Sequence, residues 1–369
     1  MTEWKECLLG DLITFQRGHD LPKSKMSGNG YPVVGSNGII GFHNEYTTEY
    51  PSITVGRSGN VGKPYIVYGR SWSHNTSLYI KEFKGTDPVF IYYFLQTLDL
   101  GNYAGGSAVP TLNRNHIHSL NVRVPADISI QKIIANTLKV LDDKIDKNTA
   151  INKNLEQQAQ AIFANEFLSL DTLPEGWKKA SLIDIANYLN GLAMQKYRPT
   201  ADESGIPVLK IKELRQGCCD DNSELCSPSI KSDYIIHDGD VIFSWSGSLL
   251  VDLWSGGICG LNQHLFKVTS NKYDKWFYYA WTKHHLDRFV AVAADKATTM
   301  GHIKRDELAK AEVLIPNEAD YNRIGALLQP IYEMLISNRI ENKKLAATRD
   351  TLLPKLMNGE IDMSEVDYE

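Results

Sequence analysis

The sequence predicts an α+β fold in which two duplicated mixed α/β domains are separated by two long helices. Three observations lead to this prediction. Landmark residues recur in the same order in both halves of the chain, and each half contains short apolar runs broken by Gly, Pro, Ser and Asn. Each half then ends in a long segment whose apolar residues alternate between spacings of three and four. We expect these helices to pair as an antiparallel coiled coil, with a pseudo-twofold axis relating the domains.

The internal repeat is the strongest of these signals. Its matches pair Trp4 with Trp177, Gly18 with Gly191, Ser58-Gly59 with Ser246-Gly247, Asn75 with Asn262, and Arg114 with Arg305. The offset between the copies grows along the chain, as insertions in the second copy would make it, but the order of the matches never changes. Two copies are too few for a solenoid, so the repeat indicates a duplicated domain.

These features divide the chain into four parts. They are a first domain at 1–129, a long helix at 130–168, a second domain at 169–320, and a second long helix with an acidic tail at 321–369. In the first domain the apolar runs at 31–34, 52–55, 65–67 and 78–80 predict strands. Aromatic-rich stretches predict a short helix at 88–97 and its counterpart at 274–285.

The two long helices carry apolar seams that are typical of helix pairing. The residues that we expect to pair are Leu138, Leu141, Ile145, Asn152 and Leu155 in the first helix, and Leu328, Ile331, Leu335, Asn342 and Leu345 in the second. Asparagines at or beside the seams are Asn148, Asn152, Asn338 and Asn342. We expect them to meet and to fix the register at some cost in stability, so that leucine at both 152 and 342 would raise the melting temperature. Asparagines on a solvent-exposed face are the alternative.

Two prolines, Pro330 and Pro354, interrupt the second long helix. A proline inside a helix removes one backbone hydrogen bond and clashes with the preceding turn. We therefore expect a kink or a local end at each proline, with the stretch after Thr351 forming a separate short helix.

Composition and charge set limits on the function. No run approaches the ~20 apolar residues of a membrane span, and the first residues contain no apolar secretory segment, so we expect a cytoplasmic protein without a membrane partner. The formal net charge of −5 is unfavourable for binding DNA alone, because DNA-binding surfaces are basic. If the chain binds DNA, a basic partner has to supply part of the affinity.

No catalytic, cofactor-binding or metal-binding constellation emerges from the sequence. The segment 56–63 resembles a phosphate-binding loop, but its glycine spacing is one residue too long and Pro64 stands where Ser or Thr should ligate magnesium. No dinucleotide-binding glycine pattern and no esterase nucleophile motif is present. We therefore expect a chain that is not an enzyme.

The collinear landmarks, taken together, resemble the specificity subunits of type I restriction-modification systems. The segments that carry the resemblance are the Trp-Lys-…-Leu-x-Asp-Ile/Leu opening of each copy, Gly35-Ser36-Asn37-Gly38, 106–112 with 120–125, 297–303 with 313–316, and the closing 352–361. The family usually has Glu-Gln at the helix start, where this chain has Ile130-Gln131 and Tyr321-Asn322. The likeness covers nearly the whole chain, and its specificity comes from the ordered set given twice.

The resemblance implies a function and a set of partners. Each duplicated domain would be a target-recognition domain that reads one half of a bipartite site in double-stranded DNA, and the helices would fix the spacing and dock other subunits. The partners would be two adenine-methyltransferase (modification) subunits and restriction/translocase subunits. S-adenosylmethionine, ATP and Mg would bind to those partners, and no cofactor would bind to this chain.

Base recognition needs forked donors and amides, and phosphate contacts need cations and hydroxyls. In the first domain the DNA-binding candidates are Lys23, Lys25, Ser36, Asn37, Arg57, Ser58, Asn60, Lys63, Arg70 and Asn75. In the second they are Lys196, Lys210, Lys212, Arg215, Ser246, Ser248, Asn262, Gln263 and Lys296. For each of them an exposed polar loop residue without a role is the alternative.

Two other functions remain open at this point. The acidic balance favours an interaction protein that does not bind DNA, with two binding domains on a coiled-coil spacer. A nuclease or nuclease-methyltransferase fragment is the second alternative, because nuclease sites have diffuse sequence signatures.

Overall fold

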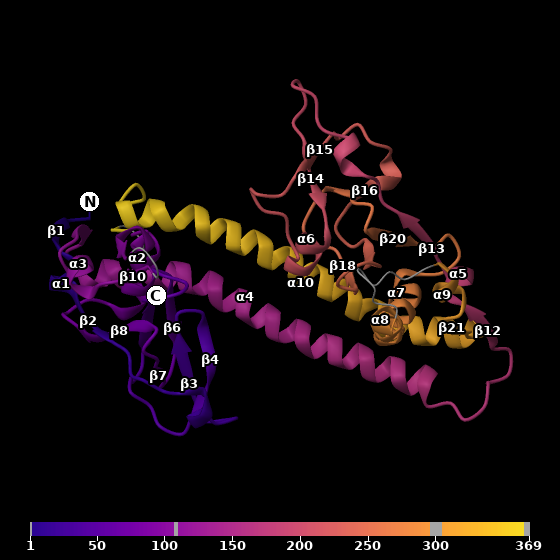
Figure 1. The fold of residues 1–369 in the computed structure, drawn as a ribbon, viewed down its shortest axis with the longest axis horizontal. Coiled ribbons are helices and arrows are strands. Elements are labelled where there is room, and N and C mark those ends of the chain that lie inside the picture. The colour runs from indigo at the N-terminus through magenta and orange to yellow at the C-terminus, as the bar shows by residue number, and fades with distance from the viewer. Residues whose placement is uncertain (1, 107–109, 296–304, 365–369) are drawn as a thin grey trace. The chain divides into compact units, whose positions relative to one another are not determined.

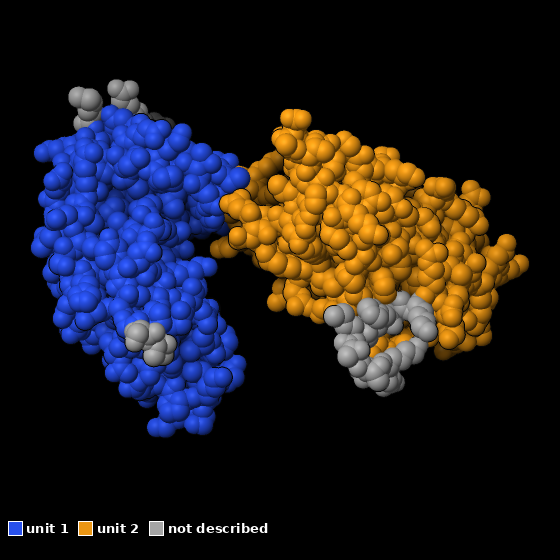
Figure 2. Space-filling model, turned by 45° about the horizontal axis from the view of Figure 1, so that its top comes forward, with its two compact units in different colours: residues 1–144, 345–369 blue, residues 145–344 orange. Residues whose placement is uncertain are grey.

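The computed structural model describes residues 2–106, 110–295 and 305–364. The chain forms two compact units, which Figure 2 colours separately: unit 1 contains residues 1–144 and 345–369, and unit 2 contains residues 145–344. The two long helices, α4 (Ile128–Phe163) and α10 (Glu318–Asn358), each contribute residues to both units. The four-part division expected from the sequence remains a prediction.

The described residues of unit 1 form four small sheets and several short helices, which are labelled in Figure 1 where there is room. Its elements are β1 (Trp4–Leu8), α1 (Leu9–Leu12), β2 (Ile13–Arg17), η1 (Lys23–Lys25), β3 (Tyr31–Gly35), β4 (Gly38–His43), β5 (Ser52–Gly56), β6 (Pro64–Val67), β7 (Trp72–Ser73), β8 (Ser77–Phe83), α2 (Pro88–Gln96), η2 (Leu100–Tyr103), β9 (Ala104–Gly105), β10 (Thr111–Leu112), α3 (Arg114–His118) and β11 (Asn121–Pro125). The sheets have the strand orders β2-β8-β5-β6, β4-β3-β7 and β1-β11, and β9 pairs with β10. All four predicted strands and the predicted helix α2 are present.

Helix α2 shows why the sequence folds this way locally. The Asp87 carboxylate accepts a hydrogen bond from the Phe90 N–H at 2.8 Å, and Pro88 occupies the first turn, where its missing N–H costs nothing. Buried aromatic and aliphatic side chains of α2 then join the core formed by the four-stranded sheet. Leu138 of α4 and Leu356 of α10 belong to the same core, so both long helices stabilise unit 1.

Unit 2 repeats this plan with additions. Its elements are a π-helical turn (Ala164–Leu168), β12 (Lys178–Ser181), α5 (Leu182–Ile185), β13 (Asn187–Asn190), η4 (Met194–Lys196), β14 (Ile206–Leu209), α6 (Ile211–Gln216), β15 (Leu225–Cys226), η5 (Ser232–Tyr234), β16 (Ile235–Ile236), β17 (Val241–Ser244), β18 (Leu250–Leu253), β19 (Cys259–Leu261), β20 (Leu265–Thr269), α7 (Lys275–His284), α8 (Leu286–Asp295), α9 (Arg305–Ala309) and β21 (Glu312–Ile315). The sheet β13-β20-β17-β18 has the order of β2-β8-β5-β6, and the antiparallel pair β12-β21 matches β1-β11. The parallel pair β14-β19 likewise matches β3-β7. The duplication inferred from the sequence is therefore a duplication of topology.

Backbone pairing corrects one match of the repeat by a single residue. His19 forms a parallel bridge with His74 in unit 1, and Leu192 forms the same bridge with Asn262 in unit 2. Asn262 therefore corresponds to His74, and Asn75 corresponds to Gln263. The sequence match of Asn75 with Asn262 is wrong because identical residues in a loop are not required to occupy equivalent backbone positions.

The expected seam residues of the long helices differ in burial. Leu138, Leu328 and Leu335 are almost completely buried, each within the core of one unit. The others are half-buried: Leu141, Ile145, Leu155, Ile331 and Leu345. In unit 1, Arg349 of α10 also donates to Asp142 of α4 at 2.6 Å. The two helices thus contact one another through both apolar and polar side chains.

The four asparagines form two hydrogen-bonded pairs within unit 2. Asn148 Nδ2 donates to Asn342 Oδ1 at 2.9 Å, and Asn338 Nδ2 donates to Asn152 Oδ1 at 2.9 Å. Asn152 also donates to the backbone oxygen of Leu335 at 3.3 Å. Leucine at 152 and 342 would remove one member of each pair, so we now expect that double substitution to lower the melting temperature rather than raise it.

The expectation that prolines divide the second helix is wrong. Helix α10 runs without a break from Glu318 to Asn358 and includes both Pro330 and Pro354. An internal proline costs about 3 kcal/mol or more. Leu328 lies beside the first proline and Leu356 beside the second, and both are almost completely buried. Burying a leucine contributes ~1.5–3 kcal/mol, so packing on the two cores offsets the local penalty.

The asparagine pairs predict a double-mutant cycle. Asn338→Leu leaves the buried Asn152 Oδ1 without its donor, so we expect the free energy of unfolding to fall by about 1–3 kcal/mol. Asn152→Leu combined with Asn338→Leu removes both polar groups and should recover most of that loss. Thermal and urea denaturation of the full chain measure both effects, with Gln329→Leu on the exposed face of α10 as the control. An unchanged stability for the single Asn338 variant would contradict the assignment.

Candidate nucleic-acid interface

Four strand ends bring three loops of unit 1 together. β2 ends at Arg17 and β5 at Gly56, while β6 begins at Pro64 and β8 at Ser77. Because neighbouring strands of this sheet are antiparallel, these four strand ends lie together at one end of the sheet. The loops 17–20, 57–63 and 74–76 therefore gather there, and we call this region sheet end 1.

Sheet end 1 contains arginines around one hollow of about 530 Å³. Arg17, Arg57 and Arg114 line it, and no Asp or Glu is among its described lining residues. The guanidinium groups of Arg57 and Arg114 have no hydrogen bond or ion pair with any residue that the structure describes. Arg17 pairs with Asp20 at 3.0 Å, but both side chains are exposed, so the pair is weak. The hollow therefore presents forked cationic donors, which suit guanine edges and phosphates.

The turn between β3 and β4 completes sheet end 1. The Ser36 N–H donates to Thr76 Oγ1 at 3.3 Å, and a Cβ atom on Gly59 would lie 3.2 Å from Ser36 Oγ. Ser36 is consequently buried and holds the loops together, whereas Asn37 is exposed at the tip of the turn.

A polar contact also joins the loops at 17–20 and 74–76. Asn75 donates to the Asp20 carboxylate, and this hydrogen bond is the main cause that holds the pKa of Asp20 below its usual value. Asp20 therefore stays ionised at neutral pH and fixes the amide of Asn75 near Arg17. Of the remaining first-domain candidates, Ser58 is half-buried beside β10, and Asn60 donates to the Tyr65 hydroxyl at 3.2 Å.

The equivalent end of the four-stranded sheet in unit 2 carries different side chains. β13 ends at Asn190 and β17 at Ser244, while β18 begins at Leu250 and β20 at Leu265. We call the loops 190–192, 245–249 and 262–264 sheet end 2. Ser244 pairs with Leu265 just as Gly56 pairs with Ser77, so the next residue, Trp245, occupies the position of Arg57.

Aromatic and amide side chains form a hydrogen-bonded group at sheet end 2. Trp245 Nε1 donates to Asn190 Oδ1 at 3.0 Å. The His264 ring joins Ser246 Oγ at 3.1 Å through Nδ1, and Gln263 Nε2 lies 3.4 Å from its Nε2. This group contains no lysine or arginine, whereas the hollow at sheet end 1 is lined by three arginines.

The second-domain cations predicted from sequence lie mostly in internal pairs. Lys210 contacts Glu224 at 2.6 Å, Lys212 contacts Asp220 at 3.1 Å, and Arg215 donates to the hydroxyl of Ser248. The Asp220 contact raises the pKa of Lys212, and burial opposes this shift. Each lysine therefore has a carboxylate beside it, although both pairs are exposed and weak, whereas Arg215 keeps its full charge.

The structure separates the remaining candidates into exposed and buried groups. Exposed residues are Lys23 and Lys25 on η1, Lys63, Arg70 and Lys196. Arg70 is bound to Glu49 at 3.4 Å and lies over the Tyr46 ring, away from sheet end 1. Ser246 and Asn262 are buried and bond within unit 2, so in this conformation they position loops. Lys296 and the 297–303 segment lie outside the described residues, as do residues 107–109.

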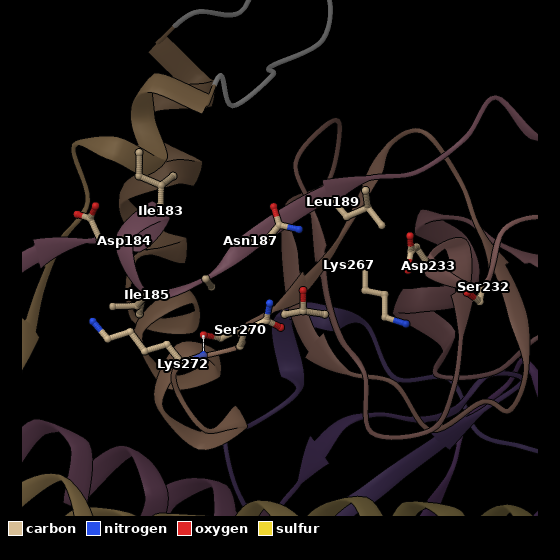
Figure 3. A pocket seen from close by; sticks show the side chains of 13 residues that line it. Ile183, Asp184, Ile185, Asn187, Leu189, Ser232, Asp233, Lys267, Ser270 and Lys272 are labelled. Atoms are coloured by element: carbon tan, nitrogen blue, oxygen red, sulfur yellow. Dashed lines mark hydrogen bonds between the residues drawn. The ribbon is translucent and has the colours of Figure 1, made fainter. Parts of the chain in front are cut away.

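A larger hollow of about 710 Å³ lies at the opposite end of the unit 2 sheet (Figure 3), beside the start of β13 and the end of β20. Asp184 and Asp233 line it together with Lys267 and Lys272. Lys267 is bound to Asp240 at 2.9 Å. This mixture of charges offers no excess of positive charge for a nucleic acid, so we place the candidate interface at the sheet ends.

Sequence reasoning missed several residues of the sheet ends. Arg17, Trp245 and His264 were not among the candidates, and Arg114 was recognised only as a landmark of the repeat. Arg17 and Trp245, like the candidate Arg57, lie at or directly after the end of a strand. A search of all strand ends, without regard to residue type, would have found them.

A family model described as the type I restriction modification DNA specificity domain matches residues 1–157 and, a second time, residues 174–346. The chain belongs to this family. The double match also confirms that the specificity subunit contains two DNA recognition domains, as the duplicated topology indicates. It favours DNA recognition over the two alternative functions that the sequence left open.

Individual relatives agree with the family assignment. The specificity subunit is 26% identical over 306 residues to the type I restriction enzyme MjaIX specificity subunit of Methanocaldococcus jannaschii, covering 75% of this chain and 70% of that one. It is 20% identical over 356 residues to the HindI specificity subunit of Haemophilus influenzae, covering 74% and 77%.

A solved structure shares the fold. The crystal structure of a type I restriction-modification S subunit from M. genitalium superimposes with a TM-score of 0.67 at 16% identity, covering 98% of this chain and 97% of that one. In the described part of the specificity subunit, none of the helices is both long and apolar enough to cross a membrane.

Gly18, at sheet end 1, provides a test of whether close approach of two backbone segments holds the loops in place. A Cβ atom on Gly18 would lie 2.1 Å from the His74 backbone oxygen, so we expect Gly18→Ala to displace the 74–76 loop and to cost about 1–3 kcal/mol of stability. Gly28→Ala is the control, because its Cβ would meet nothing within 4 Å. Urea denaturation measures the difference, and equal stability of the two variants would argue against the close approach.

Proposed function

We propose that each recognition domain reads one half of a bipartite site in double-stranded DNA through its sheet end. The observation that supports the proposal is that loops with forked or amide side chains gather at the same end of an equivalent four-stranded sheet in both domains. Arg57 follows the end of β5, and Gln263 lies in the loop before β20. Arginine forks suit guanine and glutamine amides suit adenine, so loops of this kind can discriminate bases directly.

The proposal includes a function for the long helices. We propose that α4 and α10 pair as an antiparallel coiled coil, relate the domains by a pseudo-twofold axis, and fix the spacing between the half-sites. The order of the asparagine contacts supports an antiparallel direction, because Asn148 meets Asn342 and the later Asn152 meets the earlier Asn338. A 36-residue helix such as α4 is ~54 Å long, which exceeds one ~34–36 Å turn of B-DNA.

The proposal assigns catalysis to other subunits. We propose that the chain is a non-catalytic subunit that docks two adenine-methyltransferase subunits and restriction/translocase subunits through its helices, in the cytoplasm. S-adenosylmethionine, ATP and Mg then bind to those partners. The net charge of −5 and the paired cations of unit 2 support this division, because they leave little positive charge for holding DNA without a partner.

Affinity capture from the source cell after nuclease treatment tests the assembly. We expect methyltransferase subunits to remain bound in excess over this chain, and the captured complex to bind duplex DNA with an affinity that falls as salt rises. Capture of the chain alone, or DNA binding that does not depend on sequence, would overturn the proposal.

A single substitution tests the use of sheet end 1. In the assembled complex, Arg57→Ala should weaken binding to one half-site by ~1–3 kcal/mol and leave recognition of the other half-site unchanged. Arg70→Ala is the matched control, because Arg70 is already paired with Glu49. Competition binding with DNA substituted in each half-site measures both variants. If Arg57→Ala binds every competitor like the wild type, Arg57 does not contact bases.

A further inference from the structure

The two sheet ends differ in chemistry at equivalent positions, although their backbones are alike. Arg57 in unit 1 corresponds to Trp245 in unit 2, and Arg17 corresponds to Asn190, since Gly18 and Gly191 make the same backbone bonds. The loop before β8 contains Asn75, and the loop before β20 contains Gln263 at the same position. The second domain therefore lacks two of the cationic forks that dominate the first.

Hydrogen bonds from the backbone N–H groups of Gln263 and His264 fix the conformation of the loop at 262–264. The Gln263 N–H donates to the Leu192 backbone oxygen at 2.9 Å, and the His264 N–H donates to Asn262 Oδ1 at 3.2 Å. In unit 1 the corresponding Thr76 N–H donates to His74 Nδ1 at 3.4 Å. Both loops thus use the side chain two residues earlier as an internal support, which leaves the Gln263 side chain as the variable part.

The imidazole of His264 orients the Gln263 amide. If Nδ1–H donates to Ser246 Oγ, Nε2 is left as an acceptor for one N–H of the Gln263 amide, 3.4 Å away. The amide then retains its oxygen and its second N–H. These are the acceptor and donor that match the N6 amino group and N7 of adenine in the major groove.

We propose that Gln263 is a specificity-determining residue that reads an adenine in the half-site of the second domain, with His264 as its positioning residue. This inference rests on the proposed function and adds to it the orientation of the Gln263 amide by His264 and the domain whose half-site contains the adenine. The Trp245 indole donates to Asn190 and stacks on the Phe266 ring, with 5.6 Å between the ring centroids. It therefore lies at one side of the hydrogen-bonded group at sheet end 2. Arg57 reads the other half-site, and the two domains recognise half-sites of different base composition.

The test measures base preference in the assembled complex with DNA in which each position of both half-sites is replaced by all four bases. The wild type should prefer adenine at one position of the half-site that Arg57→Ala leaves unaffected. Gln263→Ala should reduce that preference roughly tenfold and change no other position. Gln263→Glu should transfer the preference to cytosine, because a carboxylate accepts from the cytosine amino group.

Two substitutions at 264 separate positioning from folding. His264→Gln keeps an acceptor near the position of Nε2 and should retain the adenine preference, whereas His264→Phe removes the acceptor and should reduce it at the same DNA position. Asn187→Ala, at the opposite end of the unit 2 sheet, is the control, and thermal melting verifies that each variant is folded.

Failure of this inference is distinguishable from failure of the proposed function. If the wild-type complex binds no bipartite DNA site, the proposed function fails. If the complex discriminates both half-sites but the Gln263 variants keep the wild-type profile, or change the half-site that Arg57 reads, the assignment of Gln263 is overturned.

Discussion

The close approach of two backbone segments at a glycine determines much of each recognition domain. Gly18 and Gly191 each donate to the first residue of the following central strand at 3.0 Å, and any Cβ there would collide with a carbonyl oxygen. This contact joins the end of one strand to the loop before another, and it is made by backbone atoms alone. Sequence around it can therefore vary while the loops keep their places, which is why two halves with few identical residues have one topology.

The long helices act on each domain as part of its core. Leu138 and Leu356 are buried in unit 1, while Leu328 and Leu335 are buried in unit 2. The polar contacts between the helices are not accessory to this packing, because Asn148 and Asn152 are also buried and each is satisfied by the opposite helix. A buried amide that is satisfied in one register only penalises every other register.

Much of the fold could be predicted from the sequence, because apolar periodicity reports which faces are buried. The strands at 31–34 and 52–55 and both long helices follow from that signal alone. The continuity of α10 through Pro330 and Pro354 could not be predicted, since the local penalty is visible in the sequence but the compensating burial is tertiary.

The candidate interface was predicted less completely. Polar residues in loops were selected by type, and type does not report exposure or pairing: Ser36 is buried, and Lys210 is bound to Glu224. Trp245 was overlooked because an aromatic residue carries no cationic or amide signal. Its equivalence with Arg57 follows from the repeat, which pairs Ser58 with Ser246, and the strand register agrees with it.

The position of Arg57 and Trp245, one residue beyond the last paired residue of a strand, has an evolutionary consequence. A substitution there changes no backbone hydrogen bond of the sheet, although Trp245 also packs against the edge of the unit 2 core. Variation at position 57 in particular alters what the loop can contact while the pairing of the strands is kept. Single substitutions at the sheet ends can thus diversify the surface chemistry of a domain while the strand pairing and the packing of the long helices are inherited unchanged.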